Sequence, residues 1–125
     1  MIQNTKYKFS IVTAVYNIKP FLSEAIESLV AQDIGFTENV QLILVDDGST
    51  DGSGEVCNHY KEQYPNNIVV IHQENGGVSS ARNTGLKYVD GEYVNFMDGD
   101  DKFSPECLSV VYRYFKIWKG IELIS

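Results

Sequence analysis

The chain has 125 residues, of which 43% are hydrophobic and 22% charged, and its formal net charge is -7. These proportions are typical of one globular domain with a buried core and exclude a largely disordered chain. The acidic balance argues against a nucleic-acid-binding surface and against a polybasic membrane patch, because both need clustered lysine and arginine side chains.

Strands and helices are predicted to alternate along the chain. A β-branched apolar run predicts a strand at 9–15, and apolar residues at helical spacing predict a helix over 21–30. The run at 40–45, apolar at every position except Gln41, is typical of a strand buried on both faces. The same signals predict a helix at 56–64, a strand at 68–71, a helix at 78–89, a strand at 93–97, a helix that opens at Ser104-Pro105-Glu106, and a fifth strand at 121–124.

This alternation predicts an α/β fold in which a mostly parallel sheet is flanked by helices. We expect residues 1–8 to form an extended or disordered tail and residues 9–125 to form one α/β unit. Because no helix follows the last predicted strand, we expect the unit to be truncated at its C-terminus.

Targeting signals are missing from the sequence. The polar N-terminus is no signal peptide, and no stretch approaches the ~20 apolar residues of a membrane span. Cys57 and Cys107 stand far apart, which predicts neither a disulfide framework nor a zinc site. We therefore expect a cytoplasmic location, and contact with the inner face of the membrane only through other segments of a longer protein. The sequence does not indicate an oligomeric state.

The loops at the carboxyl ends of the predicted strands carry the chemistry, because ligands bind there in open α/β sheets. The loop after the first strand, 14–17, lacks G-x-G-x-x-G, which counts against a dinucleotide-binding protein. Its Tyr16 either stacks on a flat base or packs within the loop. After the second strand come Asp46 and Asp47, and buried carboxylates are costly unless they bind something. One of them can accept the ring N–H of a pyrimidine, while Ser49, Thr50 or Asp51 can cap the next helix.

The loop after the predicted strand 93–97 contains the most specific chemical pattern, Asp98-Gly99-Asp100-Asp101. Two convergent carboxylates suit Mg²⁺ or Mn²⁺, with substrate phosphates completing the shell of oxygen ligands. Upstream of this loop, the glycines at 76–77 precede a helix with Arg82 one turn in. Such a helix start either exposes backbone N–H groups to an anion or is a simple turn beside a surface arginine.

Four segments taken in order resemble the N-terminal region of family 2 glycosyltransferases of the GT-A fold: 10–17, 45–52, 74–83 and 91–101. The resemblance implies roles for individual residues. Tyr16 and Asp47 would contact the nucleobase, with Asp46 beside them in a less defined role, and Arg82 would approach the base or the diphosphate.

The same resemblance assigns the D-x-D pattern of the family to Asp98 and Asp100. Asp100 would ligate Mg²⁺ or Mn²⁺, and Asp98 would bind the ribose or nucleotide or share the metal. Asp101 would either join the metal shell or cap the following turn.

The implied function is the donor domain of an inverting glycosyltransferase. It would bind a nucleotide-diphosphate sugar, by family frequency a UDP-sugar, for transfer to a glycan or cell-surface polysaccharide acceptor. The general base of the family lies beyond residue 125, so we assign no catalytic residue and expect this chain to bind donor without transferring sugar. The alternatives are a nucleotidyltransferase-like protein and a catalytically inactive nucleotide-binding module.

Overall fold

The computed structural model describes the backbone of residues 6–124 and the side chains of residues 6–115. Over these residues four parallel strands form one sheet in the order β3-β2-β1-β4, as predicted for an α/β fold. The elements in chain order are β1 (Tyr7–Val15), α1 (Lys19–Val30), α2 (Phe36–Asn39), β2 (Val40–Asp47), α3 (Ser53–Gln63), β3 (Ile68–Gln73), α4 (Val78–Leu86), β4 (Gly91–Asp98) and α5 (Cys107–Ile124).

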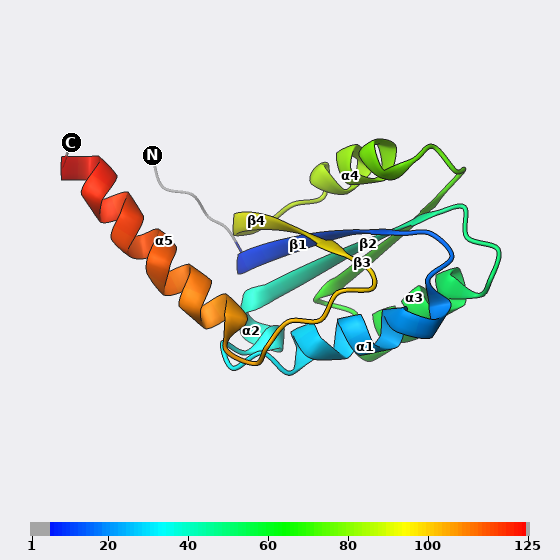
Figure 1. Cartoon of the computed structure of the whole chain (residues 1–125), viewed down its shortest axis with the longest axis horizontal. Coiled ribbons are helices and arrows are strands. Elements are labelled where there is room, and N and C mark those ends of the chain that lie inside the picture. The colour runs from blue at the N-terminus through cyan, green and yellow to red at the C-terminus, as the bar shows by residue number, and fades with distance from the viewer. Residues whose placement is uncertain (1–5, 125) are drawn as a thin grey trace.

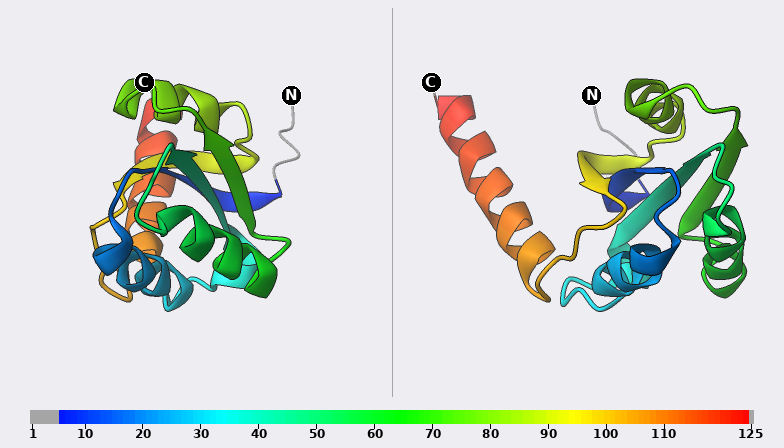
Figure 2. Two further views of the ribbon diagram at one scale, coloured as in Figure 1. Left: turned by 90° about the vertical axis from the view of Figure 1, so that its right-hand side faces the viewer. Right: turned by 45° about the vertical axis from the view of Figure 1, so that its right-hand side comes forward.

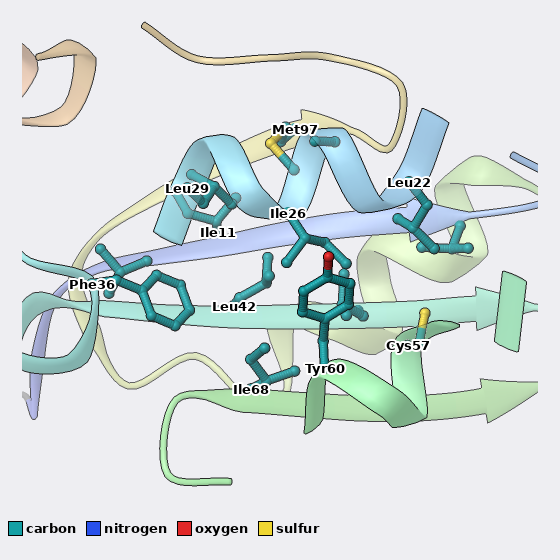
Figure 3. Packing of buried hydrophobic residues seen from close by; sticks show 14 of the residues in the cluster. Ile11, Leu22, Ile26, Leu29, Phe36, Leu42, Cys57, Tyr60, Ile68 and Met97 are labelled. Atoms are coloured by element: carbon teal, nitrogen blue, oxygen red, sulfur yellow. The ribbon is translucent and has the colours of Figure 1, made fainter. Parts of the chain in front are cut away.

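Helices cover both faces of the sheet (Figure 1). On one face, α1 and α3 pack against the strands, and Ile26, Leu42, Tyr60 and Ile68 meet in the larger of two apolar clusters (Figure 3). On the other face, α4 covers β1 and β2 with a smaller cluster that includes Ala81. Apolar side chains on both faces explain why all eight residues of β2 are buried, as expected for a central strand of a parallel sheet.

The helix α5 begins beside the end of α1, its Tyr112 and Phe115 pack against Tyr93 of β4, and its C-terminal end projects beyond the sheet (Figure 2). Its fully buried Leu108 donates its backbone N–H to Gln32 Oε1 at 2.9 Å, and Gln32 Nε2 donates to Ser104 O at 2.6 Å. These contacts fix the end of the segment that connects β4 to α5. None of the described helices is both long and apolar enough to cross a membrane.

Two predicted boundaries need correction at the ends of the chain. β1 begins at Tyr7, so Tyr7 and Lys8 belong to the sheet and not to a tail; Tyr7 pairs with Gly91 and is itself buried. The predicted fifth strand at 121–124 is wrong, because α5 continues to Ile124. Extending an existing helix adds one hydrogen bond per residue without a new nucleus, and Gly120 alone opposes it by only about 1 kcal/mol. Residues 1–5 of the expected tail lie outside the described residues.

Two smaller differences concern helix starts. The short α2 was not predicted; it occupies the connection between α1 and β2, where Phe36 is buried in the larger cluster. The last helix begins at Cys107, three residues after the predicted N-cap at Ser104, because Pro105 and Glu106 form a turn before it. The strands and their order, which decide where the loops meet, are unaffected by these corrections.

Candidate functional site

A pocket of about 270 Å³ lies at the carboxyl ends of β1, β2 and β4. The parallel register brings these ends together, since Val15 pairs with Asp46 and Ala14 pairs with Asp98. Four of the predicted site residues line the pocket together with apolar and small neighbours: Ala14, Tyr16, Ile18, Asp47, Val78, Asp98, Gly99 and Asp100. Residues that are more than 80 positions apart in the sequence therefore share one site.

Asp47 faces this pocket from the end of β2, and the residue is only 3% exposed. Its Oδ1 accepts hydrogen bonds from Gln73 Nε2 and the backbone N–H of Gly76, both at 2.9 Å. Its Oδ2 accepts from the backbone N–H of Gly77 at 2.9 Å and from Asn75 Nδ2 at 3.3 Å. Burial by itself would raise the pKa of Asp47, but the donors from Gln73, Gly76 and Gly77 outweigh it and hold the pKa below its usual value. Asp47 is thus a stable anion that fixes the turn before α4.

Asp46 points to the opposite face of the sheet, as alternation along a strand requires. Its Oδ2 lies 2.8 Å from His72 Nδ1, and its Oδ1 accepts the backbone N–H of Ser49 at 3.1 Å. On this side α3 passes close by, since a Cβ added at Gly54 would come within 2.6 Å of Asp46 Oδ2. The structure therefore separates the two adjacent acids: Asp47 lines the pocket, and Asp46 lies beneath the neighbouring loop.

The loop that carries Tyr16 is tied to the loop that follows β2. Asn17 N donates to Ser49 Oγ at 3.1 Å, and Thr50 N donates to Asn17 Oδ1 at 2.8 Å. Asn17 has a φ of 51°, the left-handed region that asparagine tolerates better than most residues. Next to this turn, Tyr16 is 50% exposed, so a face of its ring is available to a flat ligand.

The predicted side-chain cap of α3 by Ser49, Thr50 or Asp51 is wrong, because Gly52 is the N-cap and has no side chain to donate or accept a hydrogen bond; Asp51 supports the helix start from the preceding position. Asp51 Oδ1 accepts the backbone N–H of Ser53, the first residue of α3, at 2.9 Å and the hydroxyl of Ser53 at 2.6 Å. Its Oδ2 accepts the backbone N–H of Lys19 at 3.0 Å, which connects the starts of α1 and α3. These contacts hold the pKa of Asp51 below its usual value, chiefly through the hydroxyl of Ser53.

The loop after β4 gathers three exposed carboxylates. One oxygen from each of Asp98, Asp100 and Asp101 lies within 4.8 Å of the others. Oxygen ligands of this kind suit a hard divalent cation such as Mg²⁺ or Mn²⁺. Gly99 allows the loop to pass close to β1 and α1, because a Cβ there would lie 1.9 Å from Ile18 Cδ1. The donor set thus fits the cation that the sequence predicted.

Arg82 lies beside this loop from the second turn of α4. Its Nη2 is 3.4 Å from Asp98 Oδ1, and its guanidinium sits 5.3 Å from the ring centroid of Phe96. Both charged side chains are largely exposed, 41% for Arg82 and 67% for Asp98. An exposed ion pair of this kind stabilises a fold by at most about 1 kcal/mol.

Several residues around the site escaped the sequence analysis. Ile18 and Val78 supply apolar walls of the pocket from the starts of α1 and α4, where a single apolar residue gives no sign that it faces a ligand site. His72 and Asn58 support Asp46 from β3 and α3, with His72 Nε2 2.9 Å from Asn58 Oδ1. His72 pairs with Asp46 in the parallel register of β2 and β3, so that register, had it been known, would have placed the two residues side by side.

Comparisons with known proteins place these features in a wider context. The model of the glycosyl transferase family 2 matches residues 10–122. Two Bacillus subtilis proteins are similar in sequence: minor teichoic acid biosynthesis protein GgaB, 51% identical over 95% of this chain, and GgaA, 47% identical over 86%. The chain covers only 13% and 24% of the lengths of these two relatives.

Solved structures show the same arrangement of strands and helices. Crystal structures of S. aureus TarS 1-349, one in complex with UDP and one with UDP-GlcNAc, superpose with a TM-score of 0.78. They are 32% and 33% identical to this chain, and each alignment covers 87% of it and about a third of TarS 1-349, 32% and 31%. The fold of the chain is therefore the GT-A fold of those enzymes.

Proposed function

Because the chain belongs to glycosyl transferase family 2, we propose that it forms the donor-binding part of a glycosyltransferase that uses a nucleotide-diphosphate sugar. The observation that carries this proposal is the convergence of Tyr16, Asp47, Asp98 and Asp100 on one pocket at the strand ends. The aromatic ring of Tyr16 suits stacking on a base, and the buried anion of Asp47 suits the polar edge of that base. The exposed carboxylates of Asp98 and Asp100 suit a metal ion that is bound to the diphosphate.

We assign the nucleoside to the part of the pocket between Tyr16 and Asp47. The exposed ring of Tyr16 can stack on a base, and Asp47 lines the same wall close to the turn before α4. Arg82 would leave Asp98 for the diphosphate, since their ion pair is exposed and weak. The α/β unit that begins with β1 at Tyr7 would then act as the nucleotide-sugar-binding unit.

Asp98 and Asp100 would hold the divalent cation, with Asp101 able to complete its shell because its carboxylate lies in the same cluster. When bound, a divalent cation offsets the negative charge that develops on a departing nucleoside diphosphate. The carboxylates of this chain would place the diphosphate against the start of α4, where Arg82 lies one turn in.

A UDP-sugar is the donor that we propose, because TarS, which has the same fold and is 32% to 33% identical over the aligned 87% of this chain, is found with UDP and with UDP-GlcNAc. The relatives GgaB and GgaA are teichoic acid biosynthesis proteins, which supports a cell-wall polymer or similar glycan as the acceptor. We assign no general base to any residue of this chain, and we expect it to bind donor without transferring sugar.

Calorimetric titration tests the donor site directly. The chain would be titrated with UDP, UDP-glucose, GDP-mannose and NAD, each with and without Mn²⁺, and the series repeated on Asp100→Ala. We expect binding of the uridine ligands that strengthens with Mn²⁺ and a loss of that metal dependence in the variant. Glu106→Ala, which removes an exposed acid far from the pocket, is the matched control. Binding that ignores Mn²⁺ in both proteins would contradict the assigned metal site, and no binding by the folded chain would contradict the donor site.

A further inference from the structure

The side chain of Asp46 is buried, and both of its carboxylate oxygens are held by neighbouring residues. The residue is 6% exposed, and its two carboxylate oxygens are engaged by His72 Nδ1 and by the backbone N–H of Ser49. His72 is held in turn by Asn58, whose Oδ1 lies 2.9 Å from Nε2. Asp46 is not among the described residues that line the donor pocket, and α3 closes the space around it at Gly54.

Two hydrogen bonds, both involving Ser49, connect Asp46 to the backbone next to Tyr16. Asp46 Oδ1 fixes the backbone of Ser49, and Ser49 Oγ accepts the N–H of Asn17 at 3.1 Å. That N–H belongs to the peptide bond between Tyr16 and Asn17, so its position sets the direction in which the Tyr16 side chain leaves the backbone. The second contact across the loops, from Thr50 N to Asn17 Oδ1, uses a backbone donor and holds the other side of the same turn.

These contacts select the backbone conformation of the turn. Asn17 has a φ of 51°, a left-handed conformation that asparagine adopts at small cost, and the hydrogen bonds to the neighbouring loop select it over the alternatives. Without the acceptor on Ser49, the Asn17 N–H would turn to solvent and the loop could relax to other angles. The exposed ring of Tyr16 would then lose its fixed place in the wall of the pocket.

We propose that Asp46, supported by His72, is a positioning residue for Tyr16 and acts on the bound nucleotide only through Ser49 and Asn17. The inference rests on the proposed function, since it takes Tyr16 to stack on the base of a nucleoside diphosphate. It assigns different tasks to the two adjacent acids: Asp47 belongs to the wall of the pocket, and Asp46 belongs to the support of the Tyr16 loop.

The test is a double-mutant cycle on UDP affinity in the presence of Mn²⁺, measured by calorimetry on the whole chain. Asp46→Ala and Ser49→Ala each break the connection, and each should weaken UDP binding about threefold to tenfold, the loss expected for one positioning hydrogen bond. In a Tyr16→Ala background the same two substitutions should change the affinity by less than about twofold, because the residue that they position is gone.

Two further variants separate positioning from general damage to the fold. Asp46→Asn keeps an oxygen that can accept the Ser49 N–H, so it should restore most of the affinity that Asp46→Ala loses. Thr50→Ala removes the Thr50 hydroxyl, whose contact to Asn17 Oδ1 is long at 3.5 Å, but leaves the shorter hydrogen bond of 2.8 Å from the Thr50 N–H, so it should bind UDP within about twofold of the wild type. Amide hydrogen exchange gives a readout without ligand: Asn17 N–H should exchange faster in Asp46→Ala and Ser49→Ala than in Thr50→Ala.

The UDP affinities of the variants test the role of Asp46, and the affinity of the wild-type chain tests the donor site itself. Equal losses with and without Tyr16 would overturn the proposal, since Asp46 would then touch the donor or support the site as a whole. Unchanged UDP affinity in Asp46→Ala and Ser49→Ala would overturn it as well, while leaving the donor site intact. A wild-type chain that binds no nucleotide would instead overturn the proposed function, and this inference with it.

Discussion

Replacing Asp47 by alanine should destabilise the chain far more than replacing an acid on the other side of the same pocket. The Asp47 carboxylate accepts four hydrogen bonds, from Gln73, Asn75, Gly76 and Gly77. A hydrogen bond to a charged group contributes about 1.5–3 kcal/mol, and the four are not additive. Gly76 and Gly77 are exposed, so water can accept hydrogen bonds from their backbone N–H groups when the Asp47 carboxylate is removed. We therefore expect Asp47→Ala to lower the free energy of unfolding by about 2–4 kcal/mol.

The measurement is urea unfolding followed by circular dichroism, with Asp98→Ala as the matched control. Asp98 is exposed and has an ion pair with Arg82 at 3.4 Å, so its removal should cost less than about 1 kcal/mol. The difference in unfolding free energy between the two variants is large enough to measure, because the total stability of a domain is only about 5–15 kcal/mol. Equal destabilisation by Asp47→Ala and Asp98→Ala would refute the view that Asp47 holds the turn before α4.

The pH dependence gives the same prediction a second check. The pKa of Asp47 is lowered in the folded chain from its usual 3.8, because the hydrogen bonds to its anion outweigh the effect of burial. A lowered pKa means that the unfolded state takes up the proton first, so the contribution of Asp47 is present above the unfolded pKa and is lost as the pH falls through the folded pKa. The gap between wild type and Asp47→Ala should be constant above about pH 5 and should shrink below about pH 4. A gap that stays the same at pH 3 would contradict the assignment.

Three further predictions concern other residues of the chain. Gly99→Ala should lower the free energy of unfolding by about 1–3 kcal/mol, because its Cβ would meet Ile18 Cδ1, and adding Ile18→Ala should recover part of the loss if the clash is the cause. Burial raises the pKa of Cys57 to about 12, so in a thiol titration at pH 8 native protein should show only the partly exposed Cys107, and a second thiol should appear only in denaturant. Arg82→Ala should leave unfolding within about 1 kcal/mol of the wild type but weaken UDP binding in calorimetry, and a normal UDP affinity would exclude Arg82 from the donor site.

The sheet and the place of the site were predictable from the sequence for a simple physical reason. Strands that are buried on both faces are mostly apolar, and 40–45 has that pattern at every position except Gln41, which agrees with the burial of β2. Parallel strands also bring their carboxyl ends to one edge, so loops with Tyr16, Asp47 and Asp98 had to meet there. The prediction of a fifth strand was wrong because the segment 121–124 is short. Its apolar residues cannot distinguish a strand from the end of a helix.

The hydrogen bonds of the site could not be predicted in the same way. Alternation along a strand says that Asp46 and Asp47 point to opposite faces, but only the packed structure shows what each face holds. The donors to Asp47 come from residues about 30 positions later, and their approach depends on the left-handed Gly77 with a φ of 96°. The link from Ser49 to Asn17 likewise joins two loops whose separate sequences give no sign of the contact.

The two acids at the end of β2 together explain how one strand can organise a whole site. β2 is the neighbour of both β1 and β3 in the sheet, so its end lies between the loops that surround the pocket. Asp47 binds the turn before α4 on one face, and Asp46 fixes the loop that holds the Tyr16 turn on the other. An alanine at either position would lack the oxygens for these contacts, and a single acid could serve only one face. Two consecutive acids at this strand end therefore tie down one loop on each face of the sheet, because alternation along the strand points their side chains in opposite directions.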